Sequence, residues 1–415
     1  LARRWGGKMP LTRLLEQALQ HAKAGVAVTR TLHDNTTMKQ AELEGVRGFA
    51  GLFLHEGAPL TVGEPLRNPK LADTFDYLGH AGLDGFYRGD IARQIAKELE
   101  AAGSPLRLAD FEEHHASIVE PLSLRLADGT VYNLPPPTQG LASLMILGIL
   151  ERLPRAAPES FAWVHGLIEA TKQAFLVRDA HVGDPKYMTV DPARFLSAAE
   201  LEKRAGAIDP SRALPWPQPA RRGDTVWLGA IDSQGRAVSF IQSIYWEFGA
   251  GLVLPGSGIV WQNRGTSFSL DPADHNVLKP GRKPFHTIQP ALALLDDGRI
   301  MPYGTMGGEG QPQTQAMIFS RAITDGQDLQ AAITAPRWLL GRTWGTAITN
   351  LRLEGRFDED VVSGLQKAGH DVEVIGPFDE VMGHAGALIG HTMGRRRGEI
   401  EGASDPRSDG RAAGI

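Results

Sequence analysis

Apolar residues recur at intervals of three and four along the first half of the chain, beginning with Leu11, Leu14 and Leu15. This spacing is typical of an amphipathic helix, and Gly25 is placed to end the first one. The same pattern predicts further helices over 91–99, 110–115, 141–153 and 159–180.

Alternation of apolar and polar residues predicts strands in the other parts of the chain. A hairpin is expected over 117–132, and a second one joins the strands 225–231 and 237–245. Shorter strands are expected over 252–254, 258–261 and 351–354, and helices over 311–323 and 358–368. Hairpins accompanied by many helices predict a layered fold in which helices cover sheets.

Residues 205–223 show neither the helical spacing nor the strand alternation of apolar residues. Residues 205–223 carry Pro210, Pro215, Pro217 and Pro219 and end in Arg221-Arg222-Gly223. We therefore expect an exposed, mobile linker, and cleavage of the chain is tolerated in such segments.

Composition and charge narrow the class of protein without identifying it. The 415 residues are 42% hydrophobic and 22% charged, as in ordinary globular proteins, and a net charge of −5 gives no electrostatic reason to expect nucleic acid. There are no cysteines, and no apolar run reaches the length of a membrane span. The compartment stays open; the cytoplasm is the first choice and the periplasm the alternative, because a signal peptide would precede Leu1.

Thr225 has the most distinctive chemistry, because it follows the linker and begins a strand. Cleavage between Asp224 and Thr225 would give Thr225 a free α-amine beside its own hydroxyl. Such an amine titrates at about 7.7–8.0, so it can act as the base that activates the hydroxyl. The alternative is a turn residue followed by the first residue of a strand, and the Asp-Thr pair alone does not decide between them.

A metal-dependent hydrolase is a second enzyme class to consider, because His114 and His115 follow Glu112 and Glu113. Adjacent residues of a helix point about 100° apart, so the two imidazoles would not face one ion. The chain also lacks the His-Glu-x-x-His pattern. We therefore expect a solvated, acidic helix start here and no metal or other cofactor.

A series of short motifs adds a resemblance to a known family. Before Thr225 the motifs lie at 134–140 and 178–185, and after it at 248–251, 256–259, 284–290, 306–308, 335–337 and 402–407. In this order they resemble the γ-glutamyltransferase family of N-terminal-nucleophile hydrolases over nearly the whole chain.

The resemblance implies an α+β fold, the αββα sandwich, built from two pieces of a precursor that cleaves itself. It assigns 1–204 to the large subunit, 205–224 to the linker that ends at the cleavage site, and 225–415 to the small subunit. Family precursors carry about a hundred further residues before the region that matches Leu1, so we expect the N-terminal part of the large subunit to be missing. The two pieces form a heterodimer in the family, and a dimer of heterodimers is an open alternative.

The resemblance also implies catalytic roles. Thr225 would be the nucleophile and its α-amine the base, and the backbone N–H groups of Gly307 and Gly308 would form the oxyanion hole. Ser243 stands where the family has a threonine that hydrogen-bonds the nucleophile. A plain turn is the other interpretation of the Gly-Gly pair.

The expected substrate pocket departs from the family pattern. Tyr245, Arg264 and Ser267 stand where asparagine, glutamine and aspartate bind the glutamyl α-amine, and His286 and Thr287 replace a serine pair. A carboxylate is lost and a guanidinium is gained, which favours an acyl group with a carboxylate and no free α-amine. The alternatives are a surface ion pair for Arg264 and buried structural roles for Tyr245 and His286.

Two subgroups of the family fit a small amide substrate of this kind. The segments 258–265, 308–315 and 338–345 look closest to the oxamate amidohydrolases. Glutaryl or cephalosporin acylases share the loss of the α-amine site, and γ-glutamyl (glutathione) hydrolysis or transfer is disfavoured by Ser267. The non-enzyme alternative is an unprocessed, inactive paralogue or fragment that acts as an interaction protein.

Overall fold

The computed structural model describes residues 2–216, 224–341 and 349–414. Contacts divide the chain into two compact units, of which the smaller joins Leu1–Ile118 to Glu247–Asn263. The larger unit joins Val119–Trp246 to Arg264–Ile415. The division expected at Asp224 falls inside the larger unit, so the assignment of subunits stays a prediction about cleavage. Residues 342–345, the end of the motif at 338–345, lie outside the described residues.

Helices make up most of the smaller unit. Helix α2 (Leu11–Ala24) packs against α5 (Pro69–Ala81), and α7 (Asp90–Ala101) packs against α6 (Gly85–Arg88) and α8 (Leu108–Glu113). The other elements are α1 (Ala2–Trp5), α3 (Arg30–Leu43), α4 (Phe49–Phe53), and the short strand pairs β1 (Val26–Ala27) with β4 (Pro65–Leu66) and β2 (Leu54–His55) with β3 (Ala58–Pro59).

The segment 247–263 returns to the smaller unit and completes its core. Phe248 packs on Phe49 and Phe53 with ring centroids 5.3 and 5.0 Å apart. The prediction of strands over 252–254 and 258–261 is wrong, because these segments form only the single bridge between Val253 and Val260. Glycines make a tight loop there instead; Gly258 has φ +70°, and a Cβ on it would lie 2.3 Å from Asn68 Oδ1.

The larger unit is built around one antiparallel sheet with the strand order β15-β14-β10-β9-β6-β5. Alternating burial along β6 and β9 places one face of each strand in the core. The strands are β5 (Leu122–Leu126), β6 (Gly129–Asn133), β9 (Ala291–Leu295), β10 (Arg299–Thr305), β14 (Ala385–His391) and β15 (Ile400–Ser404).

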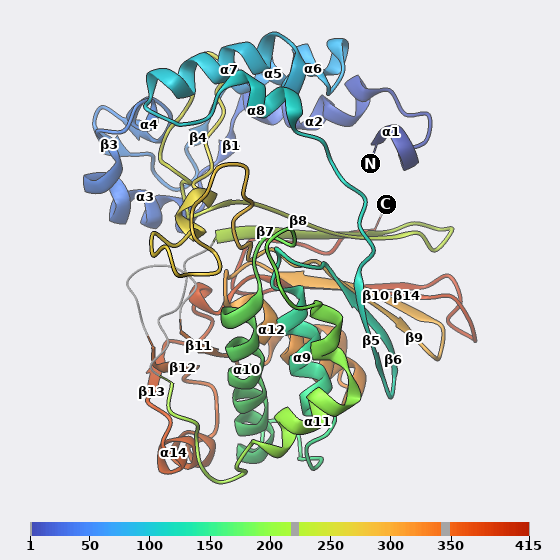
Figure 1. The fold of residues 1–415 in the computed structure, drawn as a ribbon. Coiled ribbons are helices and arrows are strands. Elements are labelled where there is room, and N and C mark those ends of the chain that lie inside the picture. Colours follow the sequence, from blue (N-terminus) through green and yellow to red (C-terminus); the bar gives the residue numbers. More distant parts are fainter. Residues whose placement is uncertain (1, 217–223, 342–348, 415) are drawn as a thin grey trace. The chain divides into compact units, whose positions relative to one another are not determined.

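Helices α9 (Gly140–Leu150), α10 (Phe161–His181) and α12 (Gly310–Phe319) form the layer on one face of this sheet (Figure 1). All residues from Gly140 to Ile149 are buried, as expected for a helix that is apolar on every side. Ser160 begins α10 by accepting a hydrogen bond from Trp163 N.

The hairpin of β7 (Asp224–Ile231) and β8 (Ala237–Tyr245) packs on the opposite face, against β10 and β14 (Figure 1). Trp227 fills this interface, and glycines make room for its ring. A Cβ on Gly304 or Gly386 would lie 2.2 or 2.4 Å from the indole. The indole Nε1 donates to Ser239 Oγ at 2.9 Å, so the ring is fixed by a polar contact as well as by packing.

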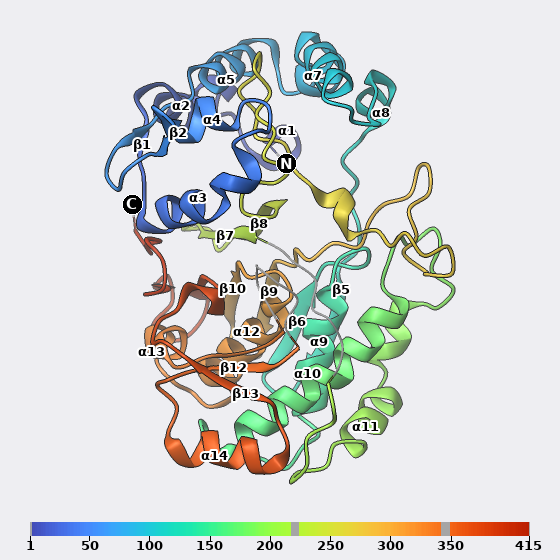
Figure 2. The same cartoon turned by 90° about the vertical axis from the view of Figure 1, so that its left-hand side faces the viewer.

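Smaller elements complete the larger unit. Strand β11 (Trp338–Leu340) pairs with β12 (Leu351–Glu354), and β12 pairs in parallel with β13 (Val372–Ile375). Helix α14 (Glu359–Ala368) packs against α10 and β13 (Figure 2), and α13 (Leu329–Thr334) packs on β15. Among the described residues, the last helix before the predicted cleavage site is α11 (Ala198–Gly206).

The segment expected to be an exposed, mobile linker is anchored in its described part, which ends at Trp216. Lys172 Nζ donates to the carbonyl of Leu214 at 2.7 Å, and Leu214 N donates to Glu169 at 3.1 Å. Ala213 is buried and donates from its N–H to the carbonyl of Ala368. Sequence patterns do not predict this anchoring, because the partners Glu169 and Lys172 are buried polar residues of α10. Residues 217–223 lie outside the described residues.

Several expected boundaries also shift. The helix expected from Asp110 begins at Leu108. The backbone N–H of Arg107, the residue before the helix, donates to the carboxylate of Asp110. The helix expected to reach residue 153 ends at Leu150, and the one over 311–323 passes at Ser320 from α-helical to π-helical turns. Within the described ranges, no helix combines the length and apolar character that crossing a bilayer requires.

Candidate active site

Thr225 lies where the pairing of β7 with β8 is irregular. Asp224 pairs with Tyr245 and Val226 with Gln242, so two residues of β8 stand opposite the single residue Thr225. Bulges of this kind re-aim side chains beside active sites. Tyr245 has φ +85°, a conformation that costs a non-glycine residue about 1–3 kcal/mol and is concentrated at functional sites. The predicted cleavage site therefore lies in irregular backbone.

Ser243 lies in this bulge, and its Oγ is 3.2 Å from Thr225 Oγ. The backbone N–H of Tyr245 donates to Ser243 Oγ at 3.0 Å, and the guanidinium of Arg264 donates to it at 3.2 Å. Ser243 Oγ also accepts a hydrogen bond from the hydroxyl of Thr225, so it positions the side chain of the predicted nucleophile.

Arg264 places a buried positive charge beside these hydroxyls. Its guanidinium lies 4.0 Å above the ring centre of Tyr245 and also donates to Thr287 Oγ1 at 3.2 Å. Burial lowers the pKa of Arg264 to about 10, while Tyr245 acts to raise it. The side chain therefore stays charged at neutral pH, and it lies close to the predicted nucleophile.

His286 is neutral in this environment. Burial lowers its pKa to about 3, and the charge of Arg264 acts in the same direction. Its Nδ1 accepts a hydrogen bond from Ile288 N at 3.4 Å, so the proton of the neutral ring belongs on Nε2. The backbone of His286 is fixed by a bond from its N–H to the carbonyl of Pro137.

Ser267 follows Arg264 in the short helix η2 (Arg264–Ser267) and is buried. Its carbonyl accepts a hydrogen bond from Asn276 Nδ2 at 2.7 Å. Its Oγ is buried without a hydrogen-bond partner among the described residues. No hydrogen bond among the described residues joins Ser267 to Thr225, and its substrate role stays a prediction.

Gly307 and Gly308 form the turn that leads into α12. Their φ angles are +130° and +50°, which glycine adopts without strain. Within the described parts of the chain, neither backbone N–H donates a hydrogen bond to another group. Two N–H donors at the start of a buried helix are suited to bind a developing oxyanion, as the sequence analysis predicts.

Gln139 connects two parts of the predicted site, and the sequence analysis did not assign it a role. It is fully buried, and its Nε2 donates to the carbonyls of Thr287 and Gly308 at 2.7 Å each. Arg178 holds the other end by donating to Gln139 Oε1 at 3.1 Å, and it also pairs with Glu309. The available signal was the presence of Gln139 and Arg178 in the family-like segments 134–140 and 178–185.

The structure thus brings most of the predicted residues together. Direct contacts join Thr225, Ser243, Tyr245, Arg264 and Thr287. Gly308 is linked to Thr287 through Gln139, and Gln311, which the sequence analysis also missed, reaches Thr225 Oγ from α12 at 3.4 Å. The catalytic and binding roles of these residues stay predictions.

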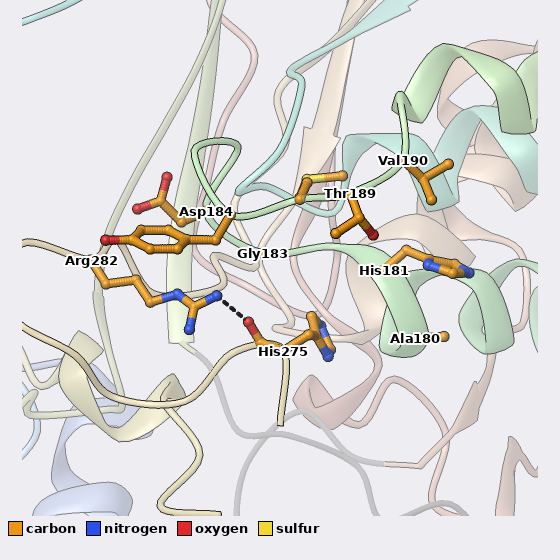
Figure 3. Close-up of a pocket in the computed structure, with 10 residues that line it drawn as sticks. Ala180, His181, Gly183, Asp184, Thr189, Val190, His275 and Arg282 are labelled. Atoms are coloured by element: carbon orange, nitrogen blue, oxygen red, sulfur yellow. Dashed lines mark hydrogen bonds between the residues drawn. The ribbon is translucent and has the colours of Figure 1, made fainter. Parts of the chain in front are cut away.

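A small cavity of about 80 Å³ lies outside this group, beside the family-like segment 178–185 (Figure 3). His181, Tyr187, His275 and Arg282 line it, and Arg282 donates to the carbonyl of His275. Burial and the neighbouring His275 lower the pKa of His181. None of the predicted site residues borders this cavity.

His165, Glu169 and His370 bring metal-ligand atom types within 4.8 Å of one another in the larger unit. The positive charge of Lys172, 2.7 Å from Glu169, already balances the carboxylate. His165 Nε2 faces the carbonyl of Asp209, so its Nδ1 accepts from His370 Nε2 at 2.9 Å. The cluster is a directed hydrogen-bond chain that fixes the segment before the predicted cleavage site.

The other histidine pair considered from the sequence lies in the smaller unit. Helix α8 ends at Glu113, so His114 and His115 follow the helix instead of lying within it, which corrects the sequence expectation. His114 packs on the ring of Tyr87 with centroids 5.0 Å apart, and Arg88 contacts His115.

A helix-covered sheet with a hairpin on its other face, and a threonine beside the start of that hairpin, fit the architecture of an N-terminal-nucleophile hydrolase. The model of the γ-glutamyltranspeptidase family matches residues 1–415. The protein therefore belongs to this family, and the predicted α+β fold of the N-terminal-nucleophile type is confirmed.

Relatives of established name agree with this assignment. The chain is 49% identical over 409 residues to an oxamate amidohydrolase proenzyme of Klebsiella pneumoniae, and the match covers 99% of the chain and 77% of that protein. It is 37% identical to a glutathione hydrolase-like proenzyme of Bacillus subtilis, with the same coverages. Among solved structures, a cephalosporin acylase of Bacillus halodurans matches with a TM-score of 0.88 and 32% identity, over 99% of this chain and 75% of that one.

Proposed function

We propose that this protein is a self-processing amidohydrolase whose substrate is a small amide with a carboxylate beside the scissile carbonyl, of the oxamate type. The observation that carries the proposal is the buried guanidinium of Arg264, 3.2 Å from Ser243 Oγ, which in turn lies 3.2 Å from Thr225 Oγ. A cation so close to the nucleophile suits a substrate whose anionic group is only one bond from the reacting carbon.

Self-processing would begin when Thr225 Oγ attacks the carbonyl carbon of Asp224. The C–N bond breaks as a C–O ester bond forms, and the proton of the hydroxyl passes to the nitrogen of Thr225. Water then hydrolyses the ester, which leaves a carboxylate on Asp224 and a free α-amine and hydroxyl on Thr225. The irregular pairing around Thr225 supports this step, because bulges re-aim the side chains beside them.

Turnover would use the same oxygen. Thr225 Oγ attacks the amide carbon, and its proton moves to the α-amine and then to the leaving nitrogen. The C–N bond breaks, ammonia departs, and an oxalyl ester of Thr225 remains. The N–H groups of Gly307 and Gly308 would bind the tetrahedral oxyanion. Water then attacks the ester, releases oxalate and returns the proton to Oγ.

The acylase or γ-glutamyl alternative keeps the same mechanism with a longer acyl group. It is supported by the structural similarity to a cephalosporin acylase. In that case Arg264 would bind the distal carboxylate of a glutaryl chain, and the carbonyl would lie farther from the guanidinium than in oxamate.

The test begins with the intact mass of the purified protein beside Thr225→Ala. We expect a wild-type protein divided between Asp224 and Thr225 and an uncut variant. The cleaved protein is then assayed for ammonia release from oxamate, glutaryl amides and γ-glutamyl amides. Preference for oxamate supports the proposal, preference for a longer chain supports the alternative, and an uncut wild-type protein without an acyl-enzyme contradicts both.

A further inference from the structure

Gln311 contacts the predicted nucleophile from a helix to which the sequence analysis gave no catalytic role. Its Nε2 lies 3.4 Å from Thr225 Oγ, and the residue is completely buried. Gln311 is the second residue of α12, which packs against α9 and β10. Every residue of α12 is buried, so the position of this side chain is set by the core and not by a surface loop.

The other end of the same amide is unusual. Gln311 Oε1 is buried and has no hydrogen-bond partner within the described parts of the chain. Buried carbonyl oxygens without a partner are rare in native proteins, and each one calls for an explanation. Here the oxygen belongs to an amide whose nitrogen end already contacts the reacting residue.

Self-cleavage would change the hydrogen-bond donors at Thr225. In the uncut chain the nitrogen of Thr225 belongs to a peptide bond and carries one hydrogen. After cleavage it is an α-amine with two hydrogens, or three when it is protonated. The nitrogen and Oγ belong to the same small residue, so an amide that contacts Oγ lies close to the new donors.

We propose that Gln311 is a catalytic residue of the cleaved enzyme, whose Oε1 accepts a hydrogen bond from the α-amine of Thr225 and so turns the lone pair of the amine toward Oγ. The unsatisfied oxygen of the precursor is then satisfied in the product of cleavage. This inference rests on the proposed function, because it requires Thr225 to be the N-terminal nucleophile.

A hydrogen bond from the α-amine to Gln311 would change the pH dependence of turnover. An acceptor beside the amine favours its protonated form, and a carboxylate would do so more strongly. Among the side chains that the structure describes, the charged and titratable groups linked to Thr225 through its neighbours are Tyr245 from β8, Arg264 from η2, His286 from the segment before β9, and the Arg178–Glu309 pair at the start of α12. All of them stay in place when only Gln311 is changed.

Two substitutions test the inference in opposite directions. We expect Gln311→Glu to move the acid limb of the kcat/KM profile for oxamate to higher pH by about one unit. Gln311→Met keeps the volume but removes the acceptor, so the acid limb should move to lower pH and kcat should fall about tenfold. A purely structural role would lower the rate without opposite shifts.

Gln313→Met is the matched control, because Gln313 lies in the same helix but bonds to Leu340. It should leave the acid limb unmoved. A crystal structure of the cleaved wild-type protein is the second measurement, which needs no variant to fold. It should place Gln311 Oε1 at hydrogen-bond distance from the α-nitrogen of Thr225.

The failures of the two proposals are distinguishable. An uncut wild-type chain without an acyl-enzyme overturns the proposed function and this inference together. A cleaved, active wild-type protein whose Gln311 variants keep the wild-type acid limb, or whose Gln311 points away from the α-amine, overturns the role of Gln311 alone.

Discussion

At the level of single residues, the proposed choice of substrate depends on Arg264. Replacing it by methionine removes the charge, and we expect kcat/KM for oxamate to fall about 100-fold, because a charge-assisted pair of hydrogen bonds is lost. Lysine should recover only part of the activity, since an ammonium cannot donate in parallel to both oxygens of a carboxylate. Ammonia release over a range of oxamate concentrations gives these values.

A neutral amide without the carboxylate serves as the control substrate for both Arg264 variants. Arg264 also touches Ser243 and Thr287, so part of any loss could come from a disturbed nucleophile. Equal losses for charged and neutral substrates would contradict the carboxylate-binding role.

Motifs in the sequence pointed to the predicted site residues with distinctive side-chain chemistry, Thr225 and Arg264, and not to their neighbours. Gln139 and Gln311 were not identifiable in this way, because a glutamine becomes functional only when the fold buries it against particular carbonyls or hydroxyls. No local pattern reports which distant groups such an amide will meet.

At the level of elements, the β7–β8 hairpin depends on glycines in the sheet beneath it. A Cβ at Gly386 would lie 2.4 Å from the ring of Trp227, so Gly386→Ala should reduce the free energy of unfolding by about 1–3 kcal/mol. Gly376→Ala is the control, because nothing lies within 4 Å of a Cβ there, and it should change stability by less than about 0.5 kcal/mol. Urea unfolding followed by fluorescence measures both, and equal effects would contradict the packing account.

Helix α10 anchors the segment before the predicted cleavage site through a buried ion pair. Glu169 and Lys172 are each 2% exposed, so Lys172→Met would leave an unpaired carboxylate and cost about 3–5 kcal/mol. It should also free Arg212 for cleavage by trypsin, because the carbonyl of Leu214 loses its partner.

The double variant Glu169→Leu with Lys172→Met distinguishes the two effects. It removes both charges and should regain most of the lost stability, while the segment around Arg212 stays sensitive to trypsin. Resistance to trypsin in both variants would show that other contacts, such as that of Ala213 with Ala368, hold the segment.

Periodicity predicted elements well where one face meets the core, as for α2, which begins at Leu11 and ends before Gly25, and for β8 over 237–245. It failed over 247–263, where glycines and single aromatic residues form a loop that completes the core of the smaller unit. It also could not show that the proline-rich segment is tied to α10, because those bonds join backbone groups to side chains far away in sequence.

At the level of the whole molecule, histidines with lowered pKa values predict a loss of stability in mild acid. Burial lowers the pKa of His286 and His370 to about 3 and that of His384 to about 4. The unfolded chain takes up these protons near pH 6.5, whereas the folded protein does not. The stabilisation is therefore complete above pH 6.5 and is lost as the pH falls toward 4.

Thermal unfolding between pH 8 and pH 4.5 tests this prediction. Tm should be nearly constant above pH 7 and should fall steadily below pH 6.5. Asp405 does not account for a change of Tm in this range. Burial acts to raise its pKa, but Arg337 and Arg407 lower it below the ordinary value of 3.8, so the stability that Asp405 contributes is lost only below that pH. His286→Gln should reduce the slope, and a flat Tm down to pH 4.5 would contradict the assignment.

The central sheet has a consequence for the life of the mature protein. Strand β6, which precedes the predicted cleavage site, pairs with β9, which follows it, so facing residues such as Val131 and Ala293 would belong to two separate polypeptides. Before cleavage the covalent chain keeps these strands at a high effective concentration; afterwards they would have to meet by diffusion. The cleaved protein would thus refold poorly after it unfolds. The lifetime of the cleaved enzyme would then depend on how slowly it unfolds.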